Sequence, residues 1–101
     1  MIKHIVMFKF RDDVEPTVRE AAAQSFKQGI EALPAVIPFI RQVQVGFNVN
    51  LAEKWDICLD STFDTLDDVK AYAVHPAHKA VAVALMQHIG ERACVDFATG
   101  E

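Results

Sequence analysis

Tyr72-Ala-Val-His75-Pro76-Ala-His78-Lys-Ala-Val81 is the segment that decides how the second half of this chain folds. Pro76 lacks a backbone N–H and has a fixed φ, so it is tolerated in the first turn of a helix and disrupts a helix further in. The residue before a proline is pushed out of the helical region, which makes His75 a cap. One helix should therefore end near residues 72–74, and a second should begin at Pro76.

His78 falls in the first turn of that second helix. Unpaired N–H groups and the positive end of the helix dipole disfavour an imidazolium at this position. A histidine that stays neutral near pH 7 can accept a proton. Tyr72 lies just across the helix break, so its side chain can face the same space.

The composition indicates one ordinary globular domain. A chain of 101 residues with 51% hydrophobic and 24% charged residues can bury a single core and has no signature of disorder. The net charge of −4, with scattered lysines and arginines, argues against a nucleic-acid-binding surface. No apolar run approaches the roughly 18 residues of a membrane span, and the N-terminus shows no signal peptide. We therefore expect no nucleic-acid partner and no membrane association.

The two cysteines indicate the cellular compartment of the protein. Cys58 and Cys94 lie far apart, in apolar strand-like runs, and form no C-x-x-C pair. We interpret them as reduced core thiols of a cytoplasmic protein, with a disulfide as the alternative interpretation.

Hydrophobic periodicity predicts four elements in the first two thirds of the chain. Residues 2–10 form a strand that is apolar on both faces, as expected of a strand covered on both sides. Acidic residues before Pro16 open an amphipathic helix that runs to about Leu33. Residues 39–47 and 55–63 alternate between apolar and polar, and the short gap between them predicts a hairpin.

Two helices and a strand complete the chain. Residues 65–68 fit a capping box with Asp in its last position, and a short helix follows them. The helix that begins at Pro76 should end at Gly90. Residues 92–97 then form the last strand through Ala93, Val95 and Phe97.

The predicted order is β-α-β-β-α-β, the ferredoxin-like arrangement of the α+β class, with a four-stranded antiparallel sheet. Its helices should cover one face of the sheet. The other face would carry Ile5 and Met7 together with Val43 and Val45, and an apolar face of that size is normally an interface. We expect a second copy to cover it, sheet against sheet, in a twofold homodimer.

Four segments carry a resemblance to a known family: residues 2–10, Pro34-Ala35, Tyr72 with His75-Pro76-Ala77-His78, and Val95-Asp96-Phe97. Through them the chain resembles the stress-responsive dimeric α/β-barrel family over nearly its whole length, residues 1–101. Members of that family pair two sheets into a closed barrel. The resemblance thus implies a dimeric α/β barrel with a role in stress response.

The resemblance also implies a site. A plant enzyme of this family closes a linear polyketide by an aldol condensation, using a tyrosine and a histidine in a cleft between sheet and helices. These roles fall on Tyr72 and His78, and a further pocket histidine falls on His4. Phe26 and Ile57 stand where that enzyme has a tyrosine and a histidine, which implies a less polar pocket.

Each of these residues also has a structural interpretation. His78 could bond a backbone carbonyl at the helix start, Tyr72 could be an aromatic anchor, and His4 could be a core histidine. His75 is expected to act mainly as a cap, at the edge of the same substrate pocket.

No cofactor is expected. His75 and His78 are separated by a helix start, and no carboxylate pattern completes a zinc site with them. The chain has no glycine-rich phosphate loop. A hard cation on backbone carbonyls near the end of the first helix, as some relatives are thought to hold, remains an open alternative.

Two function classes follow from the fold and the site. One is a stress-responsive homodimer that binds a small organic molecule in the cleft. The other is a cofactor-free cyclase or lyase that uses Tyr72 and His78. One scaffold can host both, so the fold does not choose between them.

Overall fold

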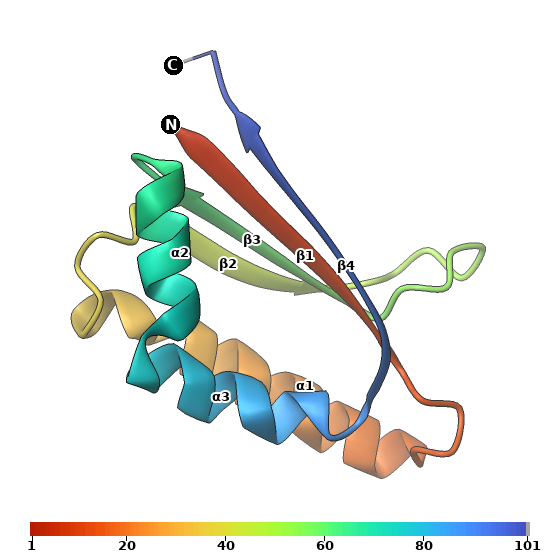
Figure 1. Cartoon of the computed structure of the whole chain (residues 1–101). Coiled ribbons are helices and arrows are strands. Elements are labelled where there is room, and N and C mark those ends of the chain that lie inside the picture. The colour runs from red at the N-terminus through yellow and green to blue at the C-terminus, as the bar shows by residue number, and fades with distance from the viewer. Residues whose placement is uncertain (101) are drawn as a thin grey trace.

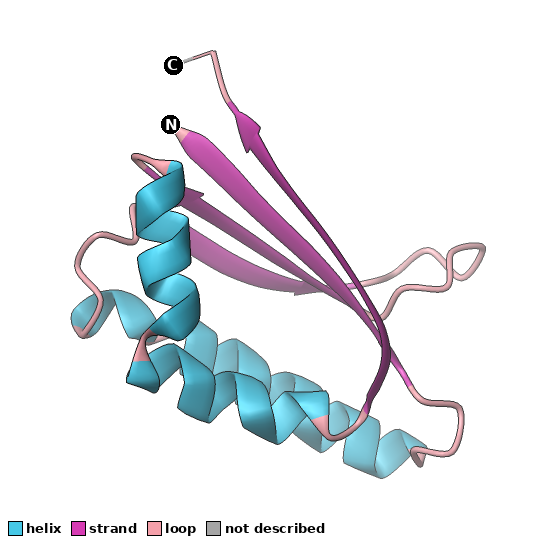
Figure 2. Cartoon of the chain, viewed as in Figure 1, coloured by secondary structure: helices cyan, strands magenta, loops and turns pink. Residues whose placement is uncertain are grey.

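In the computed structural model, which describes residues 1–100, four strands form one sheet and the helices lie on one of its faces (Figure 1). The elements run in the order β1 (Ile2–Phe10), α1 (Pro16–Glu31), the 3-10 turn η1 (Leu33–Ala35), β2 (Gln42–Phe47), β3 (Ile57–Phe63), α2 (Leu66–Val74), α3 (Pro76–Met86) and β4 (Ile89–Ala98). Figure 2 shows the two layers, with helices in cyan and strands in magenta. The predicted ferredoxin-like α+β fold is confirmed.

The sheet has the strand order β2-β3-β1-β4, and every neighbouring pair is antiparallel. β1 is central, with Val6 opposite Leu59 of β3 on one side and Cys94 of β4 on the other. The end of β4 lies beside the start of β1, because the amide of Thr99 donates to the carbonyl of Met1 at 3.0 Å. β4 is an edge strand, since within residues 1–100 it pairs with β1 alone.

The core lies between the sheet and the helices. Alternate residues of β1 and β3 point into it, while α1 contributes one apolar stripe. Its most deeply buried members, each no more than 2% exposed, are Val6, Ile30, Ile37, Val45, Ile57, Leu59, Phe63, Tyr72 and Leu85. None of the helices within residues 1–100 is long and apolar enough to cross a membrane.

The caps predicted from the sequence are present at both ends of α2. The hydroxyl of Thr65 accepts from the amide of Asp68 at 3.2 Å. His75 ends α2 and caps α3, with extended backbone (φ −66°, ψ 133°), and its Nδ1 accepts from the amide of Ala77 at 3.1 Å. The break before Pro76 is thus stabilised by the side chain that precedes the proline.

Some predicted boundaries were wrong. α3 ends at Met86, and Gly90 lies inside β4 instead of ending the helix. Pairing with β1 explains the difference, because β4 begins opposite the end of that strand, with Ile89 facing Phe10. Likewise β2 and β3 begin at Gln42 and Ile57, a few residues later than alternation suggested.

The predicted position of Val43 and Val45 on the free face of the sheet was also wrong. They pair with Ser61 and Leu59, which are buried beneath the helices. Val45 is only 1% exposed. A strand shows alternate residues to opposite faces, so both valines point towards the core.

We use the name open sheet face for the apolar surface on the side away from the helices. Ile5 and Met7 belong to it as predicted, with Cys58 of β3 beside Met7. The register of β4 adds Ala93, Val95 and Phe97. Val95 is 53% exposed and Phe97 is 47% exposed, so these apolar side chains are not covered by the rest of residues 1–100.

Both cysteines are free thiols, but neither is a core residue as the sequence suggested. Cys58 is half-buried on the open sheet face, and Cys94 is exposed on the edge strand. Alternation in β3 and β4 explains the error, because each cysteine has apolar chain neighbours that point the opposite way.

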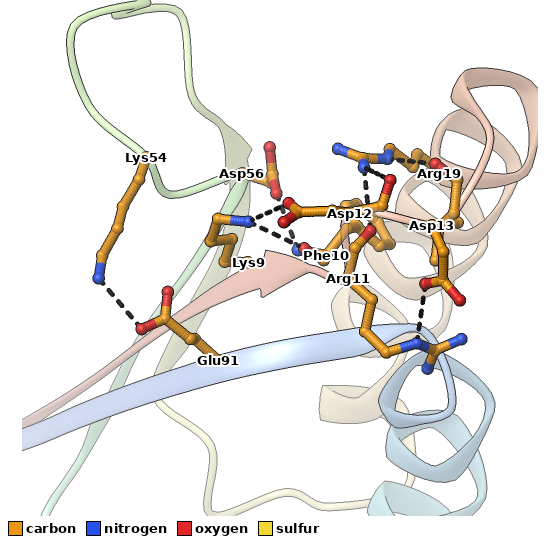
Figure 3. Close-up of polar contacts among 10 residues, drawn as sticks. Lys9, Phe10, Arg11, Asp12, Asp13, Arg19, Lys54, Asp56 and Glu91 are labelled. Atoms are coloured by element: carbon orange, nitrogen blue, oxygen red, sulfur yellow. Dashed lines mark hydrogen bonds and ion pairs between the residues drawn. The ribbon is translucent and has the colours of Figure 1, made fainter.

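Polar contacts fix the turn that leads from β1 to α1 (Figure 3). Lys9 contacts Asp12 at 3.0 Å, and Arg19 donates to the carbonyl of Arg11 at 2.9 Å. The carboxylate of Asp56 accepts from the amide of Phe10 at 2.8 Å. Exposed ion pairs of this kind stabilise a fold only slightly, so the bonds to backbone groups define the turn.

Candidate functional site

A cavity of about 180 Å³ lies between the sheet and the helix pair α2–α3. Its apolar wall consists of Val6, Phe8, Phe26, Leu59, Ala82 and Met86. Four side chains with polar groups also line it: His4, Tyr72, His78 and Arg92. An apolar cavity with a few converging polar groups is typical of a small-molecule site.

Tyr72 forms part of the cavity wall. Its ring is 1% exposed and packs against the rings of Phe63 and His78, with centroids 5.2 and 4.3 Å away. Among residues 1–100, its buried hydroxyl has no hydrogen-bond partner. Burial raises the pKa of Tyr72 well above its ordinary value, so the hydroxyl keeps its proton and remains a donor.

His78 is half-buried, and one of its nitrogens is already engaged. Nδ1 lies 3.2 Å from the carbonyl oxygen of Ala73. Because a carbonyl only accepts, Nδ1 carries the hydrogen, and Nε2 of the neutral ring is a free proton acceptor. Burial lowers the pKa of His78 and the Ala73 carbonyl opposes this effect, while electrostatic repulsion from nearby groups, Arg92 among them, lowers the pKa further.

His4 is buried at 7% exposure on the central strand. Its ring meets the rings of Phe63 and Tyr72 edge to face, with centroids 6.3 and 6.1 Å away. Nδ1 lies 2.5 Å from a carboxylate oxygen of Asp96 on the neighbouring strand. The carboxylate therefore fixes the ring orientation, and the aromatic rings restrict its movement.

The polar face of β4 was missed at the level of sequence. Arg92, Cys94 and Asp96 pair with Phe8, Val6 and His4, and so they lie on the side of the sheet that faces the helices. The sequence did contain a signal for this face: the three polar residues alternate with the apolar residues of the predicted strand, so they had to point to the opposite side of the sheet. These polar side chains were concealed by Ala93, Val95 and Phe97, which defined the strand.

Cys94 brings a sulfur into this group. Its Sγ lies 3.7 Å from Nδ1 of His4 and 4.0 Å from the second carboxylate oxygen of Asp96. Partial burial raises the pKa of the Cys94 thiol, and the Asp96 carboxylate adds to the rise. The spacing of possible ligands along the chain could not reveal this cluster, because β1 and β4 come together only in the folded sheet.

The structure brings together four of the six residues predicted for the site: His4, Phe26, Tyr72 and His78. Ile57 lies elsewhere, buried in the core at the start of β3 between Phe8 and Phe47 of the neighbouring strands. His75 lies at the junction of α2 and α3, where its side chain caps the second helix.

Two larger hollows, each of about 520 Å³, are lined by neither Tyr72 nor His78, although Phe26 also borders the first and Ile57 the second. One is a groove between α1 and α3 that includes His88. The other lies beside the β2–β3 hairpin, next to Met7 and Trp55. We favour the smaller cavity as the candidate site because it combines an unpaired hydroxyl with a histidine of lowered pKa.

Comparisons with known proteins extend these observations. A dimeric protein of unknown function with a ferredoxin-like fold, from Bacteroides fragilis, is 51% identical, with a TM-score of 0.94, covering 97% of this chain and 95% of that one. An uncharacterised protein of Streptomyces coelicolor is 33% identical over 101 aligned residues, 96% of this chain and 98% of its own. Olivetolic acid cyclase of Cannabis sativa is 29% identical over 80 residues, 76% of this chain and 75% of its own.

The family profile described as the stress responsive A/B barrel domain matches residues 2–99, which is nearly the whole chain. The match includes every strand, both sides of the helix break and all the residues that line the cavity. This chain belongs to the stress responsive A/B barrel domain family.

Proposed function

We propose that this protein is a homodimer that binds a small organic molecule with a carbonyl group in the cavity between the sheet and α2–α3. The observation that carries this proposal is the buried, unpaired hydroxyl of Tyr72. A buried donor without a partner costs roughly 1–3 kcal/mol, and a ligand oxygen would relieve that cost. The apolar wall would hold the carbon skeleton of the ligand.

The size of the cavity limits the ligand. About 180 Å³ is less than the roughly 300–1,000 Å³ of pockets that enclose drug-sized molecules. The cavity would therefore enclose a compact molecule, or the reacting end of a longer one. Arg92 is exposed and borders the cavity, so it could pair with an anionic group on the ligand.

The proposed dimer forms through the open sheet face. Val95 and Phe97 are about half exposed there, beside Ile5 and Met7. The relative from Bacteroides fragilis is described as dimeric, which supports this assembly. We also propose a cytoplasmic location, where Cys58 and Cys94 would stay reduced.

A second candidate function is catalysis by His78 and Tyr72 without a cofactor. Nε2 of His78 would take a proton from a carbon next to a carbonyl, and Tyr72 would donate a hydrogen bond to the enolate oxygen. The enolate carbon would attack a second carbonyl, whose oxygen would recover the proton from His78. The contact of the two rings at 4.3 Å and the likeness to olivetolic acid cyclase favour this candidate.

The test is calorimetric titration with a panel of β-diketones and short β-polyketones, followed by assays for turnover. Tyr72→Phe should weaken binding, and His78→Ala should abolish any turnover while a ligand still binds. His88→Ala is the matched control, because that histidine lies in the groove between α1 and α3 and does not line the cavity. Equal binding by wild type and all variants would reject the site, and binding without turnover in the wild type would reject the enzyme.

A further inference from the structure

Three possible metal ligands of different chemistry meet where β1 pairs with β4. His4 contributes a ring nitrogen, Cys94 a sulfur and Asp96 a carboxylate, and the ligand atoms all lie within 4.8 Å of one another. His4 and Asp96 are directly opposite in the register, while Cys94 is two residues away on the same side of β4. We propose that these residues form a binding site for a thiophilic divalent cation, with Zn²⁺ as the best fit.

The types of ligand select the metal. Zn²⁺ binds thiolate, imidazole and carboxylate ligands, whereas Mg²⁺ and Ca²⁺ prefer oxygen atoms only. A structural His–Asp hydrogen bond would need no sulfur beside it. The position of the Cys94 sulfur, 3.7 Å from the same nitrogen of His4, therefore gives the cluster its metal-binding character.

The distances approach those of a tetrahedral site. Zinc bonds of about 2.0–2.3 Å place neighbouring ligand atoms roughly 3.3–3.6 Å apart. The sulfur lies 3.7 Å from Nδ1 of His4, which is close to that range, and 4.0 Å from Oδ2 of Asp96, whose other oxygen, Oδ1, contacts His4. The His4–Asp96 separation of 2.5 Å is that of a hydrogen bond, and the cation would take the place of the bridging proton.

The residues around the cluster allow a cation to replace the proton between His4 and Asp96. His4 is buried, and its ring is positioned by Phe63 and Tyr72, so the ligand nitrogen is held in place. The Asp96 side chain is 30% exposed on an edge strand, and its carboxylate can rotate to widen the separation. Three protein ligands leave a fourth position for water or an added ligand.

Cobalt titration tests the proposal directly, because Co²⁺ takes zinc sites and its thiolate bond gives a near-ultraviolet charge-transfer band. Reduced protein, freed of metal with a chelator, should show this band saturating at one Co²⁺ per chain, and added Zn²⁺ should remove it. Cys94→Ser should abolish the band. Cys58→Ser is the matched control and should keep it, because Cys58 points to the open sheet face.

A second variant tests the carboxylate. Asp96→Asn keeps the size of the side chain but removes its charge. Loss of outer-shell partners typically weakens metal binding about 10–100-fold, and loss of a ligand should weaken it at least as much. Circular dichroism of each variant confirms that the fold is intact.

The proposal would be overturned by a wild type without the band, by a band unchanged in Cys94→Ser, or by a band lost in Cys58→Ser. If Cys94→Ser failed to fold, X-ray absorption of the zinc-loaded wild type would decide, since sulfur and nitrogen neighbours are expected and an all-oxygen shell would refute the site. This result does not depend on the proposed function, because it measures metal binding alone.

Discussion

The ring of His78 lies against the ring of Tyr72, with 4.3 Å between their centroids, although the two residues belong to different helices. Pro76 causes this proximity. It ends α2 at Val74 and starts α3 in a new direction, and Nδ1 of His78 then reaches back to the carbonyl of Ala73. The helix break therefore positions both polar groups of the proposed reaction.

Tyr72→Phe should leave the protein equally stable or more stable. The ring contacts with Phe63 and His78 would remain, and only a buried hydroxyl without a partner would be lost. We expect the free energy of unfolding to stay the same or rise by up to about 1 kcal/mol, as measured by urea denaturation. Tyr72→Ala is the contrasting variant and should cost about 3–5 kcal/mol. A clear loss of stability in Tyr72→Phe would mean that the hydroxyl has a structural partner.

The stability of the protein should fall with acid, in part through His78. Burial lowers the pKa of His78 in the folded state, so below its ordinary value of about 6.5 the unfolded chain binds a proton that the folded chain does not. Stability should therefore decrease as the pH falls from about 6.5 towards the lower folded pKa. His78→Gln should reduce this slope in urea denaturation measured between pH 8 and 5. An NMR titration that placed the folded pKa above the ordinary value would contradict the prediction.

The element order, the hairpin and the caps could be predicted from the sequence because their causes are local. Alternation marks a strand, Pro76 marks a helix start, and Thr65 has its capping partner three residues later. Tyr72 and His78 could be paired for the same reason, since they flank one break.

The face of the sheet to which each strand residue points could be assigned only from the folded structure. A shift of one residue in phase moves a whole strand to the opposite face, and this is how Val43 was misplaced. The cluster of His4, Cys94 and Asp96 depends on the pairing of the first strand with the last. No local sequence pattern indicates which residues of these two strands lie opposite each other.

Gly29→Ala should be destabilising even though alanine is the better helix former. An added Cβ would lie 2.9 Å from Cγ1 of Val81, where α1 packs against α3. Overpacking typically costs about 1–3 kcal/mol, against a gain of about 1 kcal/mol in helix propensity. We expect a net loss of about 1 kcal/mol, measured by urea denaturation. The double variant Gly29→Ala/Val81→Ala provides the space, so it should be more stable than Val81→Ala alone. If the effects of the two substitutions on the free energy of unfolding were strictly additive, the helices would not be in contact at these residues.

Val95→Asp should separate the proposed dimer without unfolding the chain. Val95 is 53% exposed within the chain and lies opposite Ile5 on the open sheet face, so a carboxylate there stays hydrated in a monomer and is buried only against a partner. Burying an unpaired charge costs several kcal/mol, which should raise the dimer dissociation constant about a hundredfold or more in sedimentation equilibrium. Val43→Asp should instead unfold the chain, because Val43 packs against the core. Val83→Asp is the surface control, since Val83 is 71% exposed on α3. A Val95→Asp protein that remained as dimeric as the wild type would mean that the two copies meet through another surface.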